Sequence, residues 1–381
     1  MMSRRNFLKL VGGGLVLAAV GGGAWSATRD PARARLPWQT AGEDRSDPRL
    51  HALSYALLAP NPHNRQPWLA DLGRPDEIVL YCDLDRRLPD TDPFDRQITI
   101  GLGAFVELLS MAAAENNRRS EIELFPEGEP QPRLDERPVA RIRFVADTSG
   151  ARDPLFPYVP ARRSNKEAYD MARSVPADAL SAIAGAARQR VGYSNDGGRV
   201  GELRQLAWDA MQTEFATPRA LKESIDLLRI GRAEIEARPD GISLPGPLLE
   251  GLWRSGLLSR EAMLDPDSFV FREQVAAMKS QFDTAMAFLW LVTPGNSRAD
   301  QIAAGRDYVR LNLAATAKGI AMQPFSQALQ EYPEMRPHHL SLRDRLGIDD
   351  NETLQMFVRL GYGPQIEAAP RWPLDNRIRS A

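Results

Sequence analysis

The chain has few of the residues that usually build metal centres or covalent active sites. Cys82 is the only cysteine among 381 residues, and there are four histidines. No intramolecular disulfide and no cysteine-based zinc site can therefore form. None of the histidines stands at a recognisable ligand spacing from a carboxylate or the cysteine. Cys82 itself lies in the apolar stretch EIVLYCDL, which predicts a buried structural thiol and not a nucleophile.

The chain also lacks a charge imbalance. It has 48 Lys+Arg against 50 Asp+Glu, and the formal net charge is −2. A nucleic-acid-binding protein would need a basic face, so this balance gives no electrostatic reason to expect nucleic acid as a partner. A content of 43% hydrophobic and 26% charged residues is typical of a globular protein.

The N-terminus resembles a twin-arginine export signal. Residues 3–9 read Ser-Arg-Arg-Asn-Phe-Leu-Lys, and a glycine-rich, weakly hydrophobic run follows from Leu10 to Ala24. That run is shorter than the ~20 residues that a helix needs to cross a bilayer. The resemblance implies the twin-arginine export machinery as a partner and a periplasmic or other extracytoplasmic location. If the signal at 1–27 is not cleaved, it would tether the chain to the membrane.

The rest of the chain predicts a linker followed by a mixed α+β protein. Residues 28–47 contain prolines and scattered charge, which is typical of a linker. Periodicity then predicts strands at 77–84, 121–125, 139–145, 286–294 and 353–363, and helices at 48–58, 102–116, 177–188, 200–215, 218–237, 267–274 and 299–318. The order does not alternate strictly, which favours α+β over α/β.

Two of the predicted helices form a faint internal repeat. The stretch from Gly103 in the first helix can be aligned with the stretch from Arg306 in the second, because each has an aromatic-Val-x-Leu pattern with small residues at helical spacing. The alternative is that two amphipathic helices align by chance. The repeat would divide the folded part into halves at 48–150 and 151–381, with the two helices at a pseudo-symmetric centre.

The segment APNPHNRQPW, residues 59–68, predicts a site on a stiff loop. Pro60, like the two later prolines of the segment, fixes φ and removes a backbone donor, so the preceding helix cannot continue. Asn61, Asn64 and Gln66 offer paired donors and acceptors that suit the edge of a heteroaromatic ring, and Trp68 could form a wall beside it. The alternative is that asparagine and proline simply make turns here.

The segment RRSNK predicts a phosphate site. Arg162, Arg163 and Lys166 place three cations around the hydroxyl of Ser164, directly before helical sequence. Arginine can hold phosphate through two donors, lysine adds a point charge, and a following helix N-terminus adds backbone dipoles. The alternative is a solvated basic turn.

Together these two segments resemble the FMN-dependent nitroreductase family. That family has an Arg-x-Ser-x-Lys/Arg segment for the flavin phosphate and ribityl chain, and a Pro-Ser-x-x-Asn-x-Gln-Pro-Trp loop contributed by the partner subunit. Further matches are a Gly-x-x-x-x-Pro turn at 319–324, which contains Gln323 and Pro324, and a late strand that reaches Gly361. The family's phosphate-binding basic residue after that strand corresponds to Arg371, or less closely to Arg377.

The resemblance implies a nitroreductase-like fold, an FMN cofactor and a small nitro or quinone acceptor. Because the loop precedes the RRSNK segment, one chain would imitate the family's dimer and keep one complete site, as in the Acg-like branch. Asn61 and Pro62 replace hydroxyl-bearing positions of the family loop, which weakens the prediction of catalysis. The alternative is a protein that sequesters FMN, with residues 238–260 as a lid or as a plain connecting loop.

Overall fold

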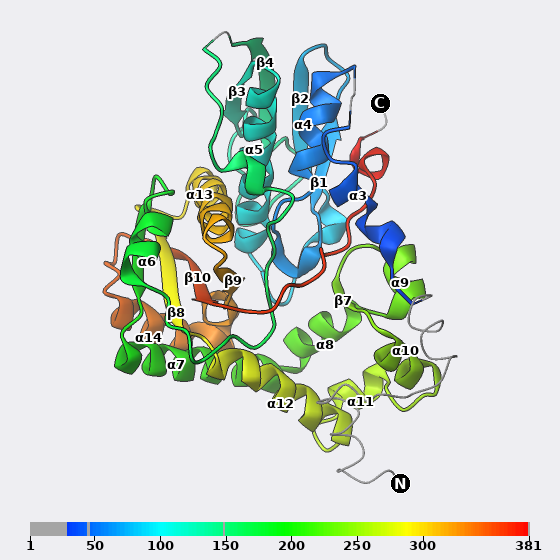
Figure 1. The fold of residues 1–381 in the computed structure, drawn as a ribbon, viewed down its shortest axis with the longest axis vertical. Coiled ribbons are helices and arrows are strands. Elements are labelled where there is room, and N and C mark those ends of the chain that lie inside the picture. The colour runs from blue at the N-terminus through cyan, green and yellow to red at the C-terminus, as the bar shows by residue number, and fades with distance from the viewer. Residues whose placement is uncertain (1–28, 44–45, 148, 380–381) are drawn as a thin grey trace.

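The computed structural model describes residues 29–43, 46–147 and 149–379. The predicted export signal at 1–27 therefore lies outside the described residues. Two four-stranded antiparallel sheets form the framework. Each sheet packs against one long helix, and these two helices lie side by side at the centre of the molecule (Figure 1). The prediction of an α+β fold with antiparallel sheets is confirmed.

The first half contains one sheet and its long helix. Alternating buried and half-buried residues along its second strand turn one face of the sheet to the core. Its elements are α4 (Pro48–Ala56), β1 (Trp68–Asp71), β2 (Glu77–Cys82), α5 (Arg96–Glu115), β3 (Arg118–Leu124) and β4 (Ala140–Ala146). Helix α5 begins earlier than predicted because the Asp92 carboxylate accepts the backbone N–H groups of Gln97 and Ile98.

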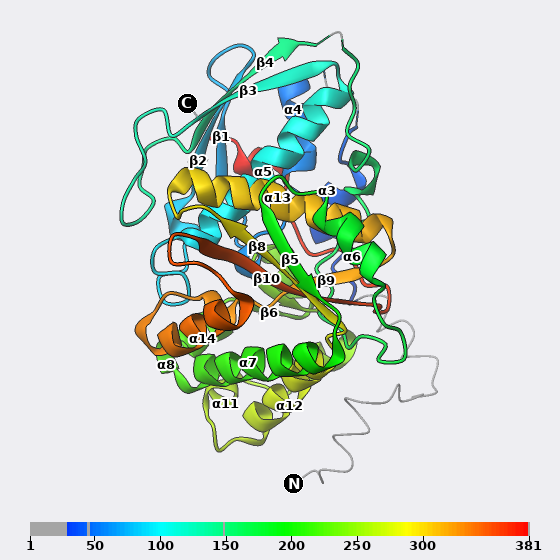
Figure 2. The same ribbon diagram turned by 90° about the vertical axis from the view of Figure 1, so that its left-hand side faces the viewer.

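The second half repeats this arrangement around a more deeply buried sheet. Every residue of its second strand is buried, because helices cover both faces (Figure 2). Its elements are α6 (Ala177–Ala184), β5 (Arg190–Ser194), α7 (Gly197–Ala216), β8 (Ala287–Thr293), α13 (Arg298–Ala317), β9 (Ala321–Pro324), α14 (Arg336–Leu346) and β10 (Thr353–Gly361).

The two halves share one topology. The strand order is β1-β2-β4-β3 in the first sheet and β5-β8-β10-β9 in the second. In both sheets the long helix connects the second strand in sequence to the third. The two sheets thus have the same strand order along the chain.

The contact between α5 and α13 is reciprocal. A Cβ atom at Gly103 would lie 2.2 Å from the carbonyl oxygen of Ile302, and a Cβ atom at Gly305 would lie 1.9 Å from that of Ile100. Each helix thus uses a glycine to bring its backbone against the other helix. The structure pairs Gly103 with Gly305, so the sequence alignment of Gly103 with Arg306 was wrong by one residue.

An insertion between β5 and β8 distinguishes the second half. It has a small core of its own and continues from α7 through α8 (Pro218–Asp226), β6 (Leu228–Ile230), α9 (Gly231–Ala237), β7 (Ile242–Leu244), α10 (Pro247–Arg254), α11 (Arg260–Leu264) and α12 (Phe269–Asp283). The single helix predicted at 218–237 was wrong. Gly231 has a φ of 74°, and the short strand β6, which pairs with β7, precedes it.

The linker predicted at 28–47 is in part folded. Residues 32–39 form two short helical turns, the second being α3 (Leu36–Gln39). Trp38 is buried, and its indole N–H donates to the carbonyl of Ala369 at 2.8 Å. The C-terminal segment crosses from β10 back over the first half to reach this point (Figure 1), and Ile378 forms a β-bridge with Ala70.

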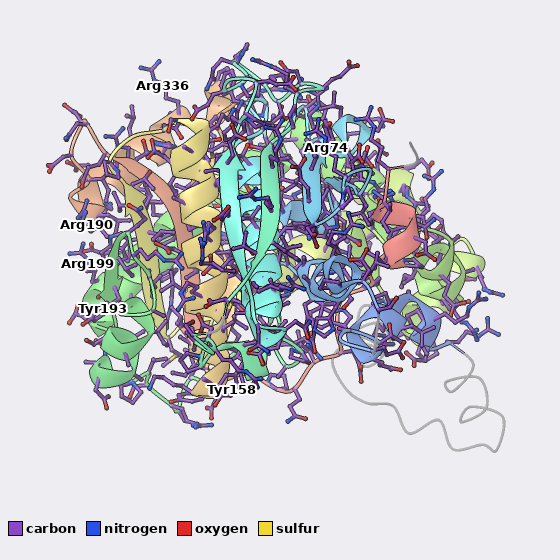
Figure 3. All side chains as sticks on the ribbon, turned by 90° about the horizontal axis from the view of Figure 1, so that it is seen from above. Arg74, Tyr158, Arg190, Tyr193, Arg199 and Arg336 are labelled. Atoms are coloured by element: carbon purple, nitrogen blue, oxygen red, sulfur yellow. The ribbon has the colours of Figure 1, made fainter. Side chains whose placement is uncertain are left out.

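Two further features concern the surface and the central helix. Strand β5 is an edge strand, and Arg190, Tyr193 and the neighbouring Arg199 mark the outer side of the second half (Figure 3). Charged side chains at such an edge disfavour pairing with another chain.

Within the described residues, α5 is the helix long and apolar enough to cross a membrane, and 83% of its most apolar window is buried inside the protein.

Candidate functional site

The loop at 59–68 has a backbone that few sequences could adopt. His63, Asn64 and Gln66 all have positive φ angles, of 46°, 51° and 52°, and asparagine and histidine tolerate this region better than most residues do. The Asn61 side chain closes the loop, since its Oδ1 accepts the Gln66 N–H at 2.7 Å and its Nδ2 donates to the Ala59 carbonyl at 3.1 Å. The stiff loop predicted from the prolines is present.

The amide side chains of this loop form hydrogen bonds with other groups of the protein. Asn64 Oδ1 accepts from Arg371 Nη1 at 2.5 Å. Gln66 is fully buried, donating from Nε2 to the Pro239 carbonyl at 2.7 Å and accepting the Trp372 N–H at 2.9 Å. The chain's own backbone and Arg371 satisfy the amides of Asn61, Asn64 and Gln66 in the structure, and their contact with a ring edge stays a prediction.

Trp68 also differs from its predicted role. It is only 1% exposed, and its ring centroid lies 5.0 Å from that of Phe105 on α5. The side chain therefore fills the core of the first half and forms no wall of a site. Pro60 is buried too, three residues after the C-cap of α4 at Leu57.

Arg162 and Arg371 meet at the C-terminal end of α4. Arg162 Nη2 donates to the Leu58 carbonyl at 2.9 Å. Arg371 donates from Nε to the Leu57 carbonyl at 2.8 Å and from Nη2 to the Ala59 carbonyl at 3.1 Å. Carbonyl groups at a helix C-terminus carry partial negative charge, so they position both guanidinium groups. Residues far apart in the sequence are thus brought together as predicted.

Three arginines surround Trp38. The guanidinium carbons of Arg162, Arg163 and Arg371 lie 5.6, 4.8 and 5.2 Å from its ring centroid. Burial and repulsion from Arg162 and Arg163 lower the pKa of Arg371 well below its usual value, and burial lowers the pKa of Arg162 to about 10. Within the described residues neither Arg162 nor Arg371 forms an ion pair with a carboxylate. We call this group the arginine cluster.

Beside the arginine cluster lie buried polar atoms that the described part of the chain leaves without hydrogen bonds. They are Nε and Nη1 of Arg162, the hydroxyl of Tyr308 and both amide atoms of Asn312. Burial raises the pKa of Tyr308 to about 12, although Arg162, Ser164 and Asn312 beside it lower that pKa. Such atoms are usually paired in folded proteins, so together they indicate a place for a polar ligand or water. The sequence analysis missed Tyr308 and Asn312 because they lie on the buried face of α13.

The RRSNK segment is fixed against the second sheet. The Asn165 N–H donates to the Met322 carbonyl at 3.0 Å. Arg359, which is fully buried on β10, donates from Nη2 to the Glu167 carbonyl at 2.7 Å and from Nε to Gln323 Oε1 at 2.7 Å. Arg359 was not predicted from the sequence, where it is one arginine in an otherwise apolar strand.

Other predicted contact residues support this framework. Gln323 uses its remaining amide group to donate to Gln281 at 3.1 Å, and Pro324 pairs with the central strand of the sheet. A Cβ atom at Gly361 would lie 2.5 Å from the Tyr169 ring. Gln323 and Gly361 therefore pack against protein groups in the structure, and their contact with a ligand stays a prediction.

Lys166 of the second half lies near His63 of the first half. Lys166 is exposed, and desolvation by the surrounding protein lowers its pKa. Burial, together with the charges of Lys166 and Arg65, lowers the pKa of His63 to about 4. Ser164 is half-buried, as is Arg163 of the arginine cluster.

The insertion is fastened to the loop by a buried carboxylate. Asp240 is 6% exposed. It accepts from Arg65 at 2.9 Å, from Arg86 at 2.8 Å and from Arg229 at 3.2 Å. The start of the segment at 238–260, predicted as a lid or connecting loop, therefore lies against the loop at 59–68. We call this contact the Asp240 latch.

Two negative observations limit the chemistry of the described residues. Within 29–43, 46–147 and 149–379, no group of three or more histidine, cysteine, aspartate or glutamate side chains could hold a metal ion. Burial raises the pKa of the Cys82 thiol above its usual value. A thiol in that state is a poor nucleophile.

Comparison with known proteins gives distant relatives, several of them named as nitroreductases. No family model matches the chain. A protein of Mycobacterium tuberculosis named putative NAD(P)H nitroreductase Rv3131 is 24% identical over 328 residues, which cover 85% of this chain and 88% of that protein. The M. tuberculosis putative NAD(P)H nitroreductase acg is 33% identical over 75 residues, 20% of this chain and 22% of that protein. These similarities support the nitroreductase resemblance seen in the motifs.

Solved structures of nitroreductases are similar to parts of the chain. A putative nitroreductase from Anabaena variabilis covers 81% of this chain and 82% of its own length, with a TM-score of 0.39 and 12% identity. The FMN-dependent nitroreductase NfnB from Mycobacterium smegmatis, solved with NADPH, covers 58% of this chain and 95% of its own length, with a TM-score of 0.35 and 21% identity.

Proposed function

We propose that this chain binds FMN and acts as a nitroreductase-like oxidoreductase. The observation that carries the proposal is the arginine cluster, where Arg162 and Arg371 are buried without a carboxylate partner in the described structure. Burying unpaired cations is costly, and an anionic ligand would remove that cost. A flavin phosphate is the anion that the motif resemblance favours, and the distant relatives named putative NAD(P)H nitroreductases agree with that resemblance.

The residues around the cluster fit the rest of such a cofactor. Arg162, whose Nε and Nη1 have no partner among the described residues, would hold the phosphate through charge-assisted hydrogen bonds. Arg371 would add positive charge nearby, since its own N–H groups already donate to carbonyl oxygens and to Asn64. The unpaired groups of Tyr308 and Asn312, together with the Ser164 hydroxyl, would bind ribityl hydroxyls. Lys166 would lie toward the ring. When bound, FMN supplies two-electron transfer between a donor and an acceptor, while the protein binds it, orients it and limits water access.

The proposed substrate class is based on the names of the relatives. The named relatives are putative NAD(P)H nitroreductases, so a small nitro or quinone compound is the expected acceptor. The repeated sheet topology supports an internal duplication in which one chain replaces a dimer, and the short similarity to acg supports placement in the Acg-like branch.

Replacing Arg162 by alanine tests the phosphate site. We expect the FMN dissociation constant to rise about tenfold or more, since a charge-assisted contact contributes ~1.5–3 kcal/mol. Flavin fluorescence quenching during titration of the apoprotein measures it. Arg74→Ala, which removes an exposed arginine, is the control and should bind FMN normally. Equal affinity of both variants would remove Arg162 from the site, and a wild-type protein that takes up no FMN would refute the proposal.

A second candidate function is FMN sequestration with little turnover. The Asp240 latch favours it, because Arg65 of the loop and Arg86 of the first half hold Asp240 of the insertion and restrict exchange at that side. Anaerobic reduction by NADPH, with a nitroaromatic acceptor present, separates the two functions. Rapid bleaching followed by reoxidation would support the oxidoreductase, and a flavin that stays oxidised would support sequestration.

Export in folded form is a separate part of the proposal. It rests on the sequence of residues 3–24 alone, and it would place the chain in the periplasm with the cofactor loaded before transport. A nicotinamide donor is cytoplasmic, so an exported enzyme would need a different reductant.

A further inference from the structure

His63 has unused hydrogen-bonding capacity inside the candidate site. It lies in the 3₁₀ turn Pro62–Asn64 and is half-buried. Its Nδ1 is buried without a hydrogen bond, and no other described group contacts the imidazole through a hydrogen bond or ion pair. A buried imidazole nitrogen without a partner is costly, unless a ligand or water supplies the hydrogen bond.

The other polar side chains of the loop cannot take this role. The side-chain amides of Asn61, Asn64 and Gln66 form hydrogen bonds with other protein groups. Arg65 is bound by Asp240 and by backbone carbonyls. Trp68 keeps an unpaired indole N–H, but its side chain is enclosed in the first-half core. His63 is therefore the loop side chain that combines free polar atoms with access.

The charged neighbour of His63 from the second half lies at the opposite end of the RRSNK segment from Arg162. Residues 162–166 run without helical or strand structure from the cluster toward Lys166, and a chain of that length spans up to ~13 Å. Lys166 is the neighbour from the second half whose charge lowers the pKa of His63. A ligand anchored at Arg162 and extended along this segment would bring its far end to His63.

We infer that His63 is the group through which the loop hydrogen-bonds the ring end of the bound cofactor. The inference rests on the proposed FMN function and adds a contact that the sequence motif assigned to the amides. With Lys166 and Arg65 as its charged neighbours, the imidazole stays neutral near pH 7. It can therefore donate from one nitrogen and accept at the other.

Comparison of FMN with riboflavin, which lacks the phosphate, tests this inference. We expect His63→Asn and His63→Phe to raise the dissociation constants of both flavins about fivefold to tenfold, the effect of one lost hydrogen bond. Arg162→Ala should weaken FMN binding and leave riboflavin binding nearly unchanged. Asparagine tolerates the positive φ of this position, so His63→Asn should keep the wild-type melting temperature.

The control is His339→Asn. His339 is another histidine whose pKa burial lowers to about 4, but it lies on α14 outside the site. It should bind both flavins as the wild type does. If wild-type protein binds FMN and both His63 variants bind the two flavins with unchanged affinity and absorption maxima, the inference is wrong while the proposed function stands. If wild-type protein binds neither flavin, both are wrong.

Discussion

The close contact between the central helices makes a strong prediction about Gly305. A Cβ atom there would lie 1.9 Å from the Ile100 carbonyl oxygen, and the reciprocal position Gly103 would place one 2.2 Å from that of Ile302. Neither oxygen belongs to a side chain that can rotate away. The helices would have to separate, although both are buried along most of their length.

We expect Gly305→Ala to destabilise the protein by about 2 kcal/mol or more. Overpacking a rigid core costs ~1–3 kcal/mol and occasionally more, and a direct backbone overlap belongs at the upper end. Alanine in a helix interior returns ~1 kcal/mol relative to glycine. The net loss should lower the melting temperature by about 4 °C or more.

Thermal unfolding followed by circular dichroism measures this shift, and Gly201→Ala is the matched control. Gly201 lies inside α7, and a Cβ atom there would meet nothing within 4 Å. The same substitution should therefore raise the melting temperature slightly. If Gly305→Ala and Gly103→Ala behave like Gly201→Ala, the reciprocal glycine contact does not exist as described.

Two further predictions concern buried carboxylates. Asp240→Asn should destabilise the insertion by about 3 kcal/mol, because it removes the shared counter-charge of Arg65, Arg86 and Arg229; limited proteolysis should then cut within 238–260 sooner than in wild-type protein, and unchanged digestion would refute the latch. Burial raises the pKa of Glu214 to about 7, so this group's stability contribution is fully present below the unfolded pKa of about 4.5 and is lost as pH rises through 7. Glutamine cannot ionise, so Glu214→Gln should avoid a loss of stability of up to about 3 kcal/mol at high pH. The melting temperature of this variant, relative to that of the wild type, should therefore increase from pH 5 to pH 8. A melting-temperature difference that does not change with pH would contradict the raised pKa.

Local patterns in the sequence predicted much of the secondary structure. The strand at 353–363 and the helix at 299–318 agree closely with β10 and α13, because unbroken apolar runs and helical periodicity report burial directly. The prediction failed at 218–237, where periodicity continued across Gly231 and gave no sign of a short strand. It also failed at 28–47, because the burial of Trp38 depends on the returning C-terminal segment.

The candidate site was predicted in part. The sequence alone selected the loop at 59–68, the segment RRSNK and Arg371 as parts of one site. The structure brings Arg162 and Arg371 within hydrogen-bond distance of neighbouring carbonyls of α4. It does not support ring contacts from Asn64 or Gln66, whose amides have partners hundreds of residues away in Arg371 and Trp372.

The sequence by itself determined which segments are polar, stiff or apolar, because those properties depend on residue type and short spacing. It could not determine which groups each side chain forms hydrogen bonds with, since the partners come from other elements. Only the tertiary structure decided that the loop amides are satisfied, that His63 is not, and that Trp38 and Tyr308 border the arginine cluster. The physical reason is that a buried polar group takes whichever partner the packed chain brings to it.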